Sequence, residues 1–325
     1  MIKTNIMKSN FFFLAVLMFL SCDNETIGGV IGEASAPNAS VFSDVSSLIQ
    51  DLKSESQTFD ISDQTIPSTI IGQGGTIIDF AANSFTDSDG NAVTSGIVIL
   101  LDEYLSLAEM MKNNIQTLSN GQLLVTGGSF NLAATDNNNN PLTINPGSIN
   151  SQLPILTDIT GFESGMSLFV GETNTINGTE QINWTQGNNN EFWLNEGFMN
   201  FYGIDLGLSN CDVLYEMAGE DGTQFSVYVE NNTTPSNYMI WMFINDFPSV
   251  ISISSPTDDG LGVKTYDGSI PVGLNATILA IGVDDDNYLK FGTLDVDVLG
   301  DDNFTVTVDY GTTENLSALI DQLGG

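Results

Sequence analysis

The stretch from Thr277 to Val298 sets the expected fold, and it reads TILAIGVDDDNYLKFGTLDVDV. Two apolar runs of strand length flank the tetrapeptide DDDN at Asp284–Asn287. Runs rich in Ile, Val, Phe and Thr favour extended backbone, and Asp and Asn clustered between such runs favour tight turns. The stretch therefore predicts two paired strands joined by a solvated, acidic hairpin tip.

Similar runs recur from Gln57 onward, separated by Gly, Asn, Asp and Pro. Some of them alternate apolar and polar residues, as in Phe225–Val229 and Phe304–Val308. The other runs are Thr58–Ile61, Thr76–Phe80, Gly96–Leu101, Ser129–Ala134, Ser167–Val170, Tyr238–Ile244 and Val250–Ser254. Many short strands with few helices predict an all-β protein built from β-sandwiches.

Three segments have helical spacing instead. The first follows Ser43 or Asp44 and ends near Lys53, with its apolar residues three and four positions apart. The second runs from Ser106 to about Asn113. The third is a small C-terminal docking helix from Thr312 or Thr313 to Leu323, because its leucines and isoleucine share one helical face.

The N-terminal segment is predicted to direct the chain out of the cytoplasm. Two lysines precede an apolar run, Phe11–Leu20, which is too short to span a bilayer core that needs about 20 residues. The run ends in Leu20-Ser21-Cys22, which resembles the lipobox of bacterial lipoproteins, although Phe19 stands where Leu, Val or Ile is usual. The sequence thus predicts lipidation of Cys22. The alternative is an ordinary secretory signal with an incidental cysteine.

The lipobox resemblance implies a location. Two or three acyl chains on one cysteine anchor a protein stably, whereas a single chain binds a membrane only marginally. Asp23-Asn24-Glu25 resembles the signal that sends Bacteroidota lipoproteins to the outer face of the outer membrane. We therefore expect a protein anchored by lipid to the outer membrane, on its extracellular face.

Composition excludes several classes of function. The chain has six Lys and no Arg against 41 Asp and Glu, for a formal net charge of −35. Such a surface repels nucleic acid, because phosphate contacts require basic side chains. There is no His, which removes the commonest general base of enzymes. After Cys22 the only cysteine is Cys211, so the mature chain is expected to contain no intramolecular disulfide. Cys211 is expected to be a small buried hydrophobe.

These absences predict a protein that is not an enzyme and needs no cofactor. A hydrolase could still work with two carboxylates about 5–10 Å apart, but nothing in the sequence selects such a pair.

The expected domain organisation follows the changes in composition. Residues 1–21 form the lipoprotein signal peptide, and residues 22–56 form an acylated N-terminus and flexible tether. Residues 57–157 form a first β-sandwich module. Residues 158–222 are a loop-rich linking segment expected to pack with the second module, which covers residues 223–325 and ends in the C-terminal helix.

Between Gly72 and Pro154 the chain resembles a module common in Bacteroidota surface and secreted proteins. The matching pieces are Gly74–Thr76, Ala82–Phe85, Asp87–Val93, Gly96–Glu103, Ala108–Met111, Ser119–Phe130, Ala134–Gly147 and Leu153-Pro154. This module is similar to the ZU-type β-sandwich, and Ile270–Gly282 resembles the immunoglobulin-like module that follows it in such proteins. The resemblance implies a surface β-sandwich protein with no assigned catalytic residues.

Two acidic loops are candidate calcium sites, since Ca²⁺ takes six to eight oxygen ligands. The first offers Asp87, Asp89 and Asn91, and the second offers Asp284, Asp285 and Asp286. Both loops are also what tight turns require, so a purely structural role is the alternative.

An aromatic group from Trp184 to Tyr202 lies among Asn, Gln and Gly residues. Flat rings can stack on the C–H faces of sugars while neighbouring amides pair with hydroxyls, so Trp184, Trp193 and Tyr202 are candidate glycan-binding residues. The alternative is that these rings fill a sandwich core.

The expected function is that of a non-catalytic binding or accessory subunit of a cell-envelope protein complex, such as one built around an outer-membrane barrel. The alternative is a glycan-binding surface lipoprotein of a polysaccharide-uptake system. An exposed aromatic platform would favour the glycan, and an exposed apolar patch or unpaired strand edge would favour a protein partner.

Overall fold

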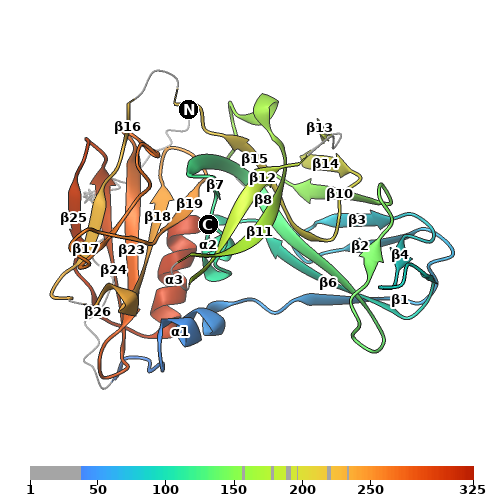
Figure 1. Ribbon diagram of the computed structural model, residues 1–325, viewed down its shortest axis with the longest axis horizontal. Helices are drawn as coiled ribbons and strands as arrows, with labels where there is room; N and C mark the ends of the chain where they lie inside the picture. The colour runs from blue at the N-terminus through green and yellow to red at the C-terminus, as the bar shows by residue number, and fades with distance from the viewer. Residues whose placement is uncertain are drawn as a thin grey trace, which may run out of the picture. The chain divides into compact units, whose positions relative to one another are not determined.

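The structure is a computed structural model (Figure 1). It describes residues 38–155, 158–176, 179–187, 192–195, 197–217, 221–232 and 234–325. The predicted signal peptide and the predicted lipidation site, Cys22, lie outside the described residues. Among the described residues, no helix has the length and apolarity needed to cross a bilayer.

Two sheets form the first sandwich. One is seven-stranded, with β7 (Leu118–Ser119) paired to β8 and the other strands in the order β1 (Gln57–Ile61), β6 (Ile97–Tyr104), β8 (Gln122–Asp136), β15 (Gly207–Leu214), β11 (Ser167–Ile176) and β12 (Thr179–Gln186). The other has the order β13 (Phe192–Asn195), β14 (Phe198–Tyr202), β10 (Ile149–Pro154), β3 (Ile77–Phe80) and β2 (Ser68–Ile71). A small sheet joins β5 (Ala92–Val93), β4 (Phe85–Thr86) and β9 (Thr143–Ile144).

The second sandwich follows in the chain. Its four-stranded sheet has the order β20 (Ser255–Pro256), β21 (Val263–Lys264), β17 (Ser226–Val229) and β25 (Asn303–Val306). Its five-stranded sheet has the order β19 (Val250–Ile253), β18 (Tyr238–Ile244), β23 (Asn275–Val283), β24 (Leu289–Asp297) and β26 (Asp309–Tyr310). The short strands β16 (Gly222–Thr223) and β22 (Ile270–Pro271) pair with each other. The all-β sandwich fold is thus confirmed, as is the predicted hairpin, in which β23 and β24 pair from Asn275↔Asp297 to Val283↔Leu289.

The three predicted helices are also present, and side-chain caps set where they begin. Helix α1 (Val45–Leu52) and helix α2 (Leu107–Lys112) each start with a capping box, closed by Asp44 and Ser106. Helix α3 (Thr313–Gly324) starts at Thr312, whose hydroxyl accepts a hydrogen bond from the N–H of Asn315. Two 3₁₀ turns, η3 (Glu163–Gly165) and η4 (Pro235–Asn237), complete the helical elements of the described chain.

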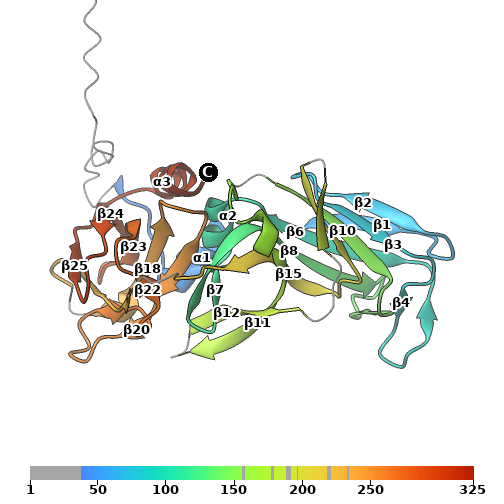
Figure 2. The same cartoon turned by 90° about the horizontal axis from the view of Figure 1, so that it is seen from above.

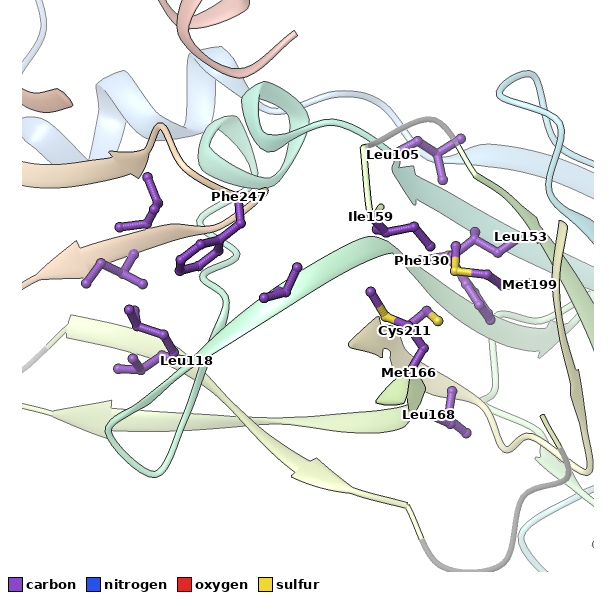
Figure 3. Packing of buried hydrophobic residues seen from close by; sticks show 14 of the residues in the cluster. Leu105, Leu118, Phe130, Leu153, Ile159, Met166, Leu168, Met199, Cys211 and Phe247 are labelled. Carbon is purple, nitrogen blue, oxygen red and sulfur yellow. The ribbon is translucent and has the colours of Figure 1, made fainter. Parts of the chain in front are cut away.

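One continuous apolar cluster fills both sandwiches. In the first sandwich, Phe130 of β8 packs with Leu153 of β10 and Met199 of β14 (Figure 3). A second cluster covers the outer face of β18, β23 and β24, where Trp241 and Leu279 are fully buried. Its other members come from the three helices and from β11 and β12, including Leu48, Met110, Met111, Phe169, Trp184, Leu316 and Ile320. Figure 2 shows α3 lying beside β23 and β24.

The segment expected to link the modules belongs to the first sandwich, so that prediction is wrong. Strand β15 pairs with β8 over Gly207–Leu214, and β14 pairs with β10. Within this segment, expected to be rich in loops, strands β11 and β12 form a hairpin paired from Phe169↔Gln186 to Ile176↔Thr179. A hairpin can be held by backbone hydrogen bonds without apolar side chains, so its polar sequence did not reveal the strands. Polar side chains on an edge strand also hinder pairing with strands of other molecules.

The end of the expected tether is likewise part of the fold. The N–H of Ser40 donates to the carbonyl of Gly311 at 3.0 Å, and the N–H of Leu289 donates to the carbonyl of Ser40 at 2.8 Å. Helix α1 then buries Leu48, Ile49 and Leu52. The chain is therefore bound to the second sandwich from Ser40 onward.

Buried hydrogen bonds centred on Thr117 join the two sandwiches. Its N–H donates to the carbonyl of Val250 at 2.8 Å, and its hydroxyl accepts from the N–H of Val250 at 2.9 Å. That hydroxyl also lies 2.7 Å from the hydroxyl of Ser249. A further bond runs from the N–H of Thr126 in β8 to the carbonyl of Pro248 at 2.9 Å. We call these contacts the seam.

Candidate functional site

The candidate site is the outer face of the five-stranded sheet β13-β14-β10-β3-β2. Strand β10 alternates, so that Ile149, Ser151 and Leu153 are buried while Asn150 and Gln152 are half-buried on the opposite side. The pairing with β14 places Asn150 opposite Tyr202 and Gln152 opposite Asn200. Antiparallel partners point to the same face of a sheet, so these polar residues and Tyr202 share the outer face.

An aromatic pair lies on this face. The rings of Trp193 on β13 and Tyr202 on β14 stack, with their centroids 4.5 Å apart and their planes 29° from parallel. Trp193 is half-buried, and Tyr202 is 45% exposed. On the inner side of the same two strands, Phe192 packs against Phe201 at 5.3 Å. This inner contact anchors the edge strand β13 to the core and so holds the outer pair in place.

Asn200 positions the aromatic pair. It is only 6% exposed, and its amide donates to the carbonyls of Trp193 at 3.3 Å and Phe198 at 3.2 Å. These bonds tie β13 to β14 at the position of the tryptophan. The amides left for a ligand are therefore those of Asn150, whose oxygen already accepts from the N–H of Gly203 at 3.4 Å, and of Gln152.

We call Trp193, Tyr202, Asn150 and Gln152 the aromatic–amide face. Figure 1 shows β13, β14 and β10 side by side. The face continues across Asp79, whose carboxylate accepts from the hydroxyl of Thr69 at 2.6 Å. Rings and amides without a nearby cation suit a neutral ligand that offers both C–H faces and hydroxyl groups, because buried or partly buried polar groups need hydrogen-bond partners.

Trp184 does not belong to this face, so its assignment as a glycan-binding residue is wrong. It is fully buried in β12, and its indole Nε1 donates to the carbonyl of Gln116 at 2.5 Å. A Cβ at Gly171, its cross-strand partner, would lie 2.8 Å from the indole ring. The absent side chain of Gly171 leaves the space that the ring fills, so Trp184 is a core residue, as is Trp241.

The candidate calcium loops use their carboxylates within the turns. Asp87 Oδ1 accepts from the N–H of Asn91 at 2.8 Å and from the N–H of Asp89 at 3.0 Å. Hydrogen bonds from the side chain and backbone of Asn91 lower the pKa of Asp87. Both features describe an Asx-type turn, the structural alternative considered above.

The acidic hairpin tip has the same architecture. Asp284 Oδ1 accepts from the N–H groups of Asp286 at 3.0 Å and Tyr288 at 2.9 Å, and Oδ2 lies 3.9 Å from Lys290 Nζ. Across the described residues, no three Asp, Glu, Cys or His side chains are arranged to hold a metal ion. The turn is thus the better-supported role for Asp87, Asp89 and Asn91, and for Asp284, Asp285 and Asp286.

One buried carboxyl group with a raised pKa was not predicted from the sequence. Asp212 of β15 is fully buried, and desolvation raises its pKa well above the ordinary value of 3.8. Its Oδ2 accepts from the amide of Asn210 at 2.6 Å, at an irregularity in the pairing of β15 with β8. No pattern in the sequence separates Asp212 from the other acids. Its neighbour Cys211 is fully buried, as expected.

Asn150, Gln152 and Asn200 were also missed. Asn150 and Gln152 could have been predicted from the sequence INSQLP at Ile149–Pro154. Its residues alternate, so that the amides lie on one face of a strand and the apolar residues on the other. Comparison with known proteins adds no assignment for any of these residues. No protein-family model matches the chain, and no curated protein is significantly similar to it.

Proposed function

We propose that this protein is a non-catalytic, carbohydrate-binding protein of the cell envelope, and that its aromatic–amide face holds the carbohydrate. The observation that carries the proposal is the stacked Trp193–Tyr202 pair on an open sheet face, with Asn150 and Gln152 on the neighbouring strand. Aromatic rings gain from covering apolar C–H surface, and amides can both donate to and accept from hydroxyls.

Charge narrows the class of carbohydrate. The chain carries a formal charge of −35, and none of the strands β13, β14, β10, β3 and β2 contains a lysine. Anionic polysaccharides would be repelled, so the proposed ligand is a neutral glycan. Lipid anchoring at Cys22 on the extracellular face of the outer membrane is part of the same proposal, and it rests on the resemblance of the N-terminal segment to a lipoprotein signal.

A binding assay on insoluble or polymeric neutral glycans tests the proposal. The full chain is purified in a detergent without a sugar headgroup and retained on immobilised polysaccharides. Trp193→Ala should weaken retention by roughly two- to tenfold, since one aromatic contact is worth about 0.5–1.5 kcal/mol beyond the area it buries. Tyr202→Phe keeps the ring and should bind like the wild type. Leu299→Ala, at a 74% exposed position outside the sheet, controls for surface changes.

Equal retention of Trp193→Ala and wild type would reject the aromatic–amide face as the site. Failure of every neutral glycan to retain the folded protein would reject the proposed function.

A protein partner is the second candidate, and the edge of the same sheet supports it. Strand β2 is one of the two edge strands of this sheet; Ile71 on it is 61% exposed, and nearby Ile66 is 59% exposed. Unpaired edges and exposed apolar side chains are used for strand addition by partners. If the protein is an accessory subunit that binds its partner through this edge, the variant Ile71→Lys should no longer co-purify with the partner. Its retention on glycans should be unchanged. If Ile71→Lys co-purifies with the same proteins as the wild type, this edge is not the interface.

A further inference from the structure

A cleft of about 720 Å³ lies where the β7–β8 hairpin of the first sandwich meets the loop before β22 in the second. This volume falls within the range of about 300–1,000 Å³ typical of small-molecule sites. The walls are rich in amides and tyrosines, and they hold one acid, Asp267, and no base. The cleft is separate from the aromatic–amide face, because none of the four residues of that face lines it.

The hairpin tip is built to present its amide. Leu118 pairs with Leu123 and Ser119 with Gln122, which leaves the two-residue turn Asn120-Gly121. Both turn residues have positive φ, +48° and +84°, the pattern of a type I′ turn. A Cβ at Gly121 would lie 3.8 Å from Tyr266, so the turn and the tyrosine approach each other closely.

Two of the amides in the cleft hold each other. Asn183 Oδ1 accepts from the N–H of Asn120 at 2.8 Å, and Asn183 Nδ2 donates to Asn120 Oδ1 at 3.2 Å. The side-chain N–H groups of Asn120 take no part in these bonds. A third amide, Gln181, is 6% exposed and donates to the hydroxyl of Ser254 in the second sandwich, which leaves its oxygen as an acceptor. The remaining donors and acceptors are therefore held in fixed positions before any ligand arrives.

The two walls are also fixed relative to each other. Gln116 donates to the carbonyl of Ile182 at 3.1 Å in the first sandwich and accepts from the N–H of Ser252 at 3.2 Å in the second. It lies next to Thr117, the centre of the seam. Tyr215, which lines the cleft, stacks on Phe247 with ring centroids 4.4 Å apart. The cleft is thus preformed, with aromatic walls and oriented amides.

We infer that this cleft is a second ligand site that takes the end of a short neutral oligosaccharide, with Tyr266 as its stacking wall and Asn120 and Gln181 as hydrogen-bonding residues. The inference rests on the proposed carbohydrate-binding function for its ligand class. In this inference the cleft binds the ends of glycan chains, and the aromatic–amide face binds sugar units within a polysaccharide. A cleft of about 720 Å³ has room for only a short oligosaccharide, whereas a sheet face can accept sugars along a polymer.

The test measures binding of soluble neutral trisaccharides, namely maltotriose, laminaritriose, mannotriose and chitotriose. The full chain in a detergent without a sugar headgroup is titrated by calorimetry and by saturation-transfer NMR. Tyr266→Ala removes the wall, and it should weaken trisaccharide binding by about fivefold or more. Asn120→Gly removes the amide while keeping a residue that tolerates the positive φ of the turn, and it should also weaken binding.

Trp193→Ala is the matched control, because it alters only the aromatic–amide face. It should bind trisaccharides like the wild type while its polysaccharide retention weakens by roughly two- to tenfold. Wild-type trisaccharide affinity in both Tyr266→Ala and Asn120→Gly overturns the inference and leaves the proposed function intact. Loss of polysaccharide retention in Tyr266→Ala but not in Trp193→Ala supports the cleft and rejects the aromatic–amide face. Absence of trisaccharide binding to the wild type overturns the inference.

Discussion

Replacing Thr117 with Val should destabilise the whole protein, because Thr117 joins the two sandwiches through a buried hydroxyl. Val has almost the same shape as Thr, so packing changes little. The substitution removes the acceptor for the N–H of Val250 at 2.9 Å and the partner of the Ser249 hydroxyl at 2.7 Å. The backbone bond from the Thr117 N–H to the Val250 carbonyl remains.

The expected cost follows from these groups. Each buried donor or acceptor left without a partner costs about 1–3 kcal/mol, and Thr117→Val leaves the Val250 N–H and the Ser249 hydroxyl in that state. Thr117→Val should therefore lower the free energy of unfolding by about 2–6 kcal/mol. Thr117→Ser keeps the hydroxyl and loses one methyl group, so its cost should be about 1 kcal/mol.

Urea denaturation followed by tryptophan fluorescence and far-UV circular dichroism measures both variants. Trp184 lies in the first sandwich and Trp241 in the second, so the fluorescence reports on both. Because one apolar cluster continues through both sandwiches, the wild type should unfold in one transition, and coincidence of the two probes checks this. If Thr117→Val costs no more than Thr117→Ser, the hydroxyl does not hold the sandwiches together and the reasoning fails.

Three further predictions concern the remaining sites. Burial raises the pKa of Asp212 in the folded state, so this carboxyl group destabilises the fold increasingly as the pH rises above 3.8. In parallel urea titrations, the stability of Asp212→Asn relative to the wild type should therefore increase between pH 4 and pH 8. A stability difference between the two proteins that does not change with pH would contradict the raised pKa. Cys22→Ser should abolish incorporation of labelled palmitate, and continued anchoring of a processed chain would reject lipidation. Because Asp87 and Asp284 use their carboxylates in turns, millimolar Ca²⁺ should leave Tm unchanged relative to chelator, and a rise of several degrees would restore the calcium sites.

Local features of the fold could be predicted from the sequence. Asp44, Ser106 and Thr312 mark the starts of three helices because a cap is an interaction within four residues. The strands followed from apolar runs for the same reason. The placement of β15 between β8 and β11 could not be predicted, because strand pairing joins segments far apart in the chain and composition does not encode the partner.

The candidate site likewise depends on strand pairing that could not be predicted from the sequence. Trp184 and Trp193 lie in similar polar surroundings in the sequence, yet one is fully buried and the other lies on an outer face. The difference arises from register, because Gly171 opposite Trp184 leaves space for an indole, whereas Trp193 faces outward opposite Asn200. Asn150 and Gln152 join the face only through the pairing of β10 with β14.

The attachment of Ser40 to the second sandwich determines how the protein would carry mechanical load. If the chain is anchored through Cys22 as proposed, a pull from the membrane would enter through the hydrogen bonds of Ser40 to Leu289 and Gly311. A polysaccharide bound at the proposed aromatic–amide face would pull on the first sandwich. The seam at Thr117 then lies in series between anchor and cargo. Force between the proposed anchor and the proposed glycan site would therefore pass through the contacts between the two sandwiches, which are the shared apolar cluster and the hydrogen bonds of the seam.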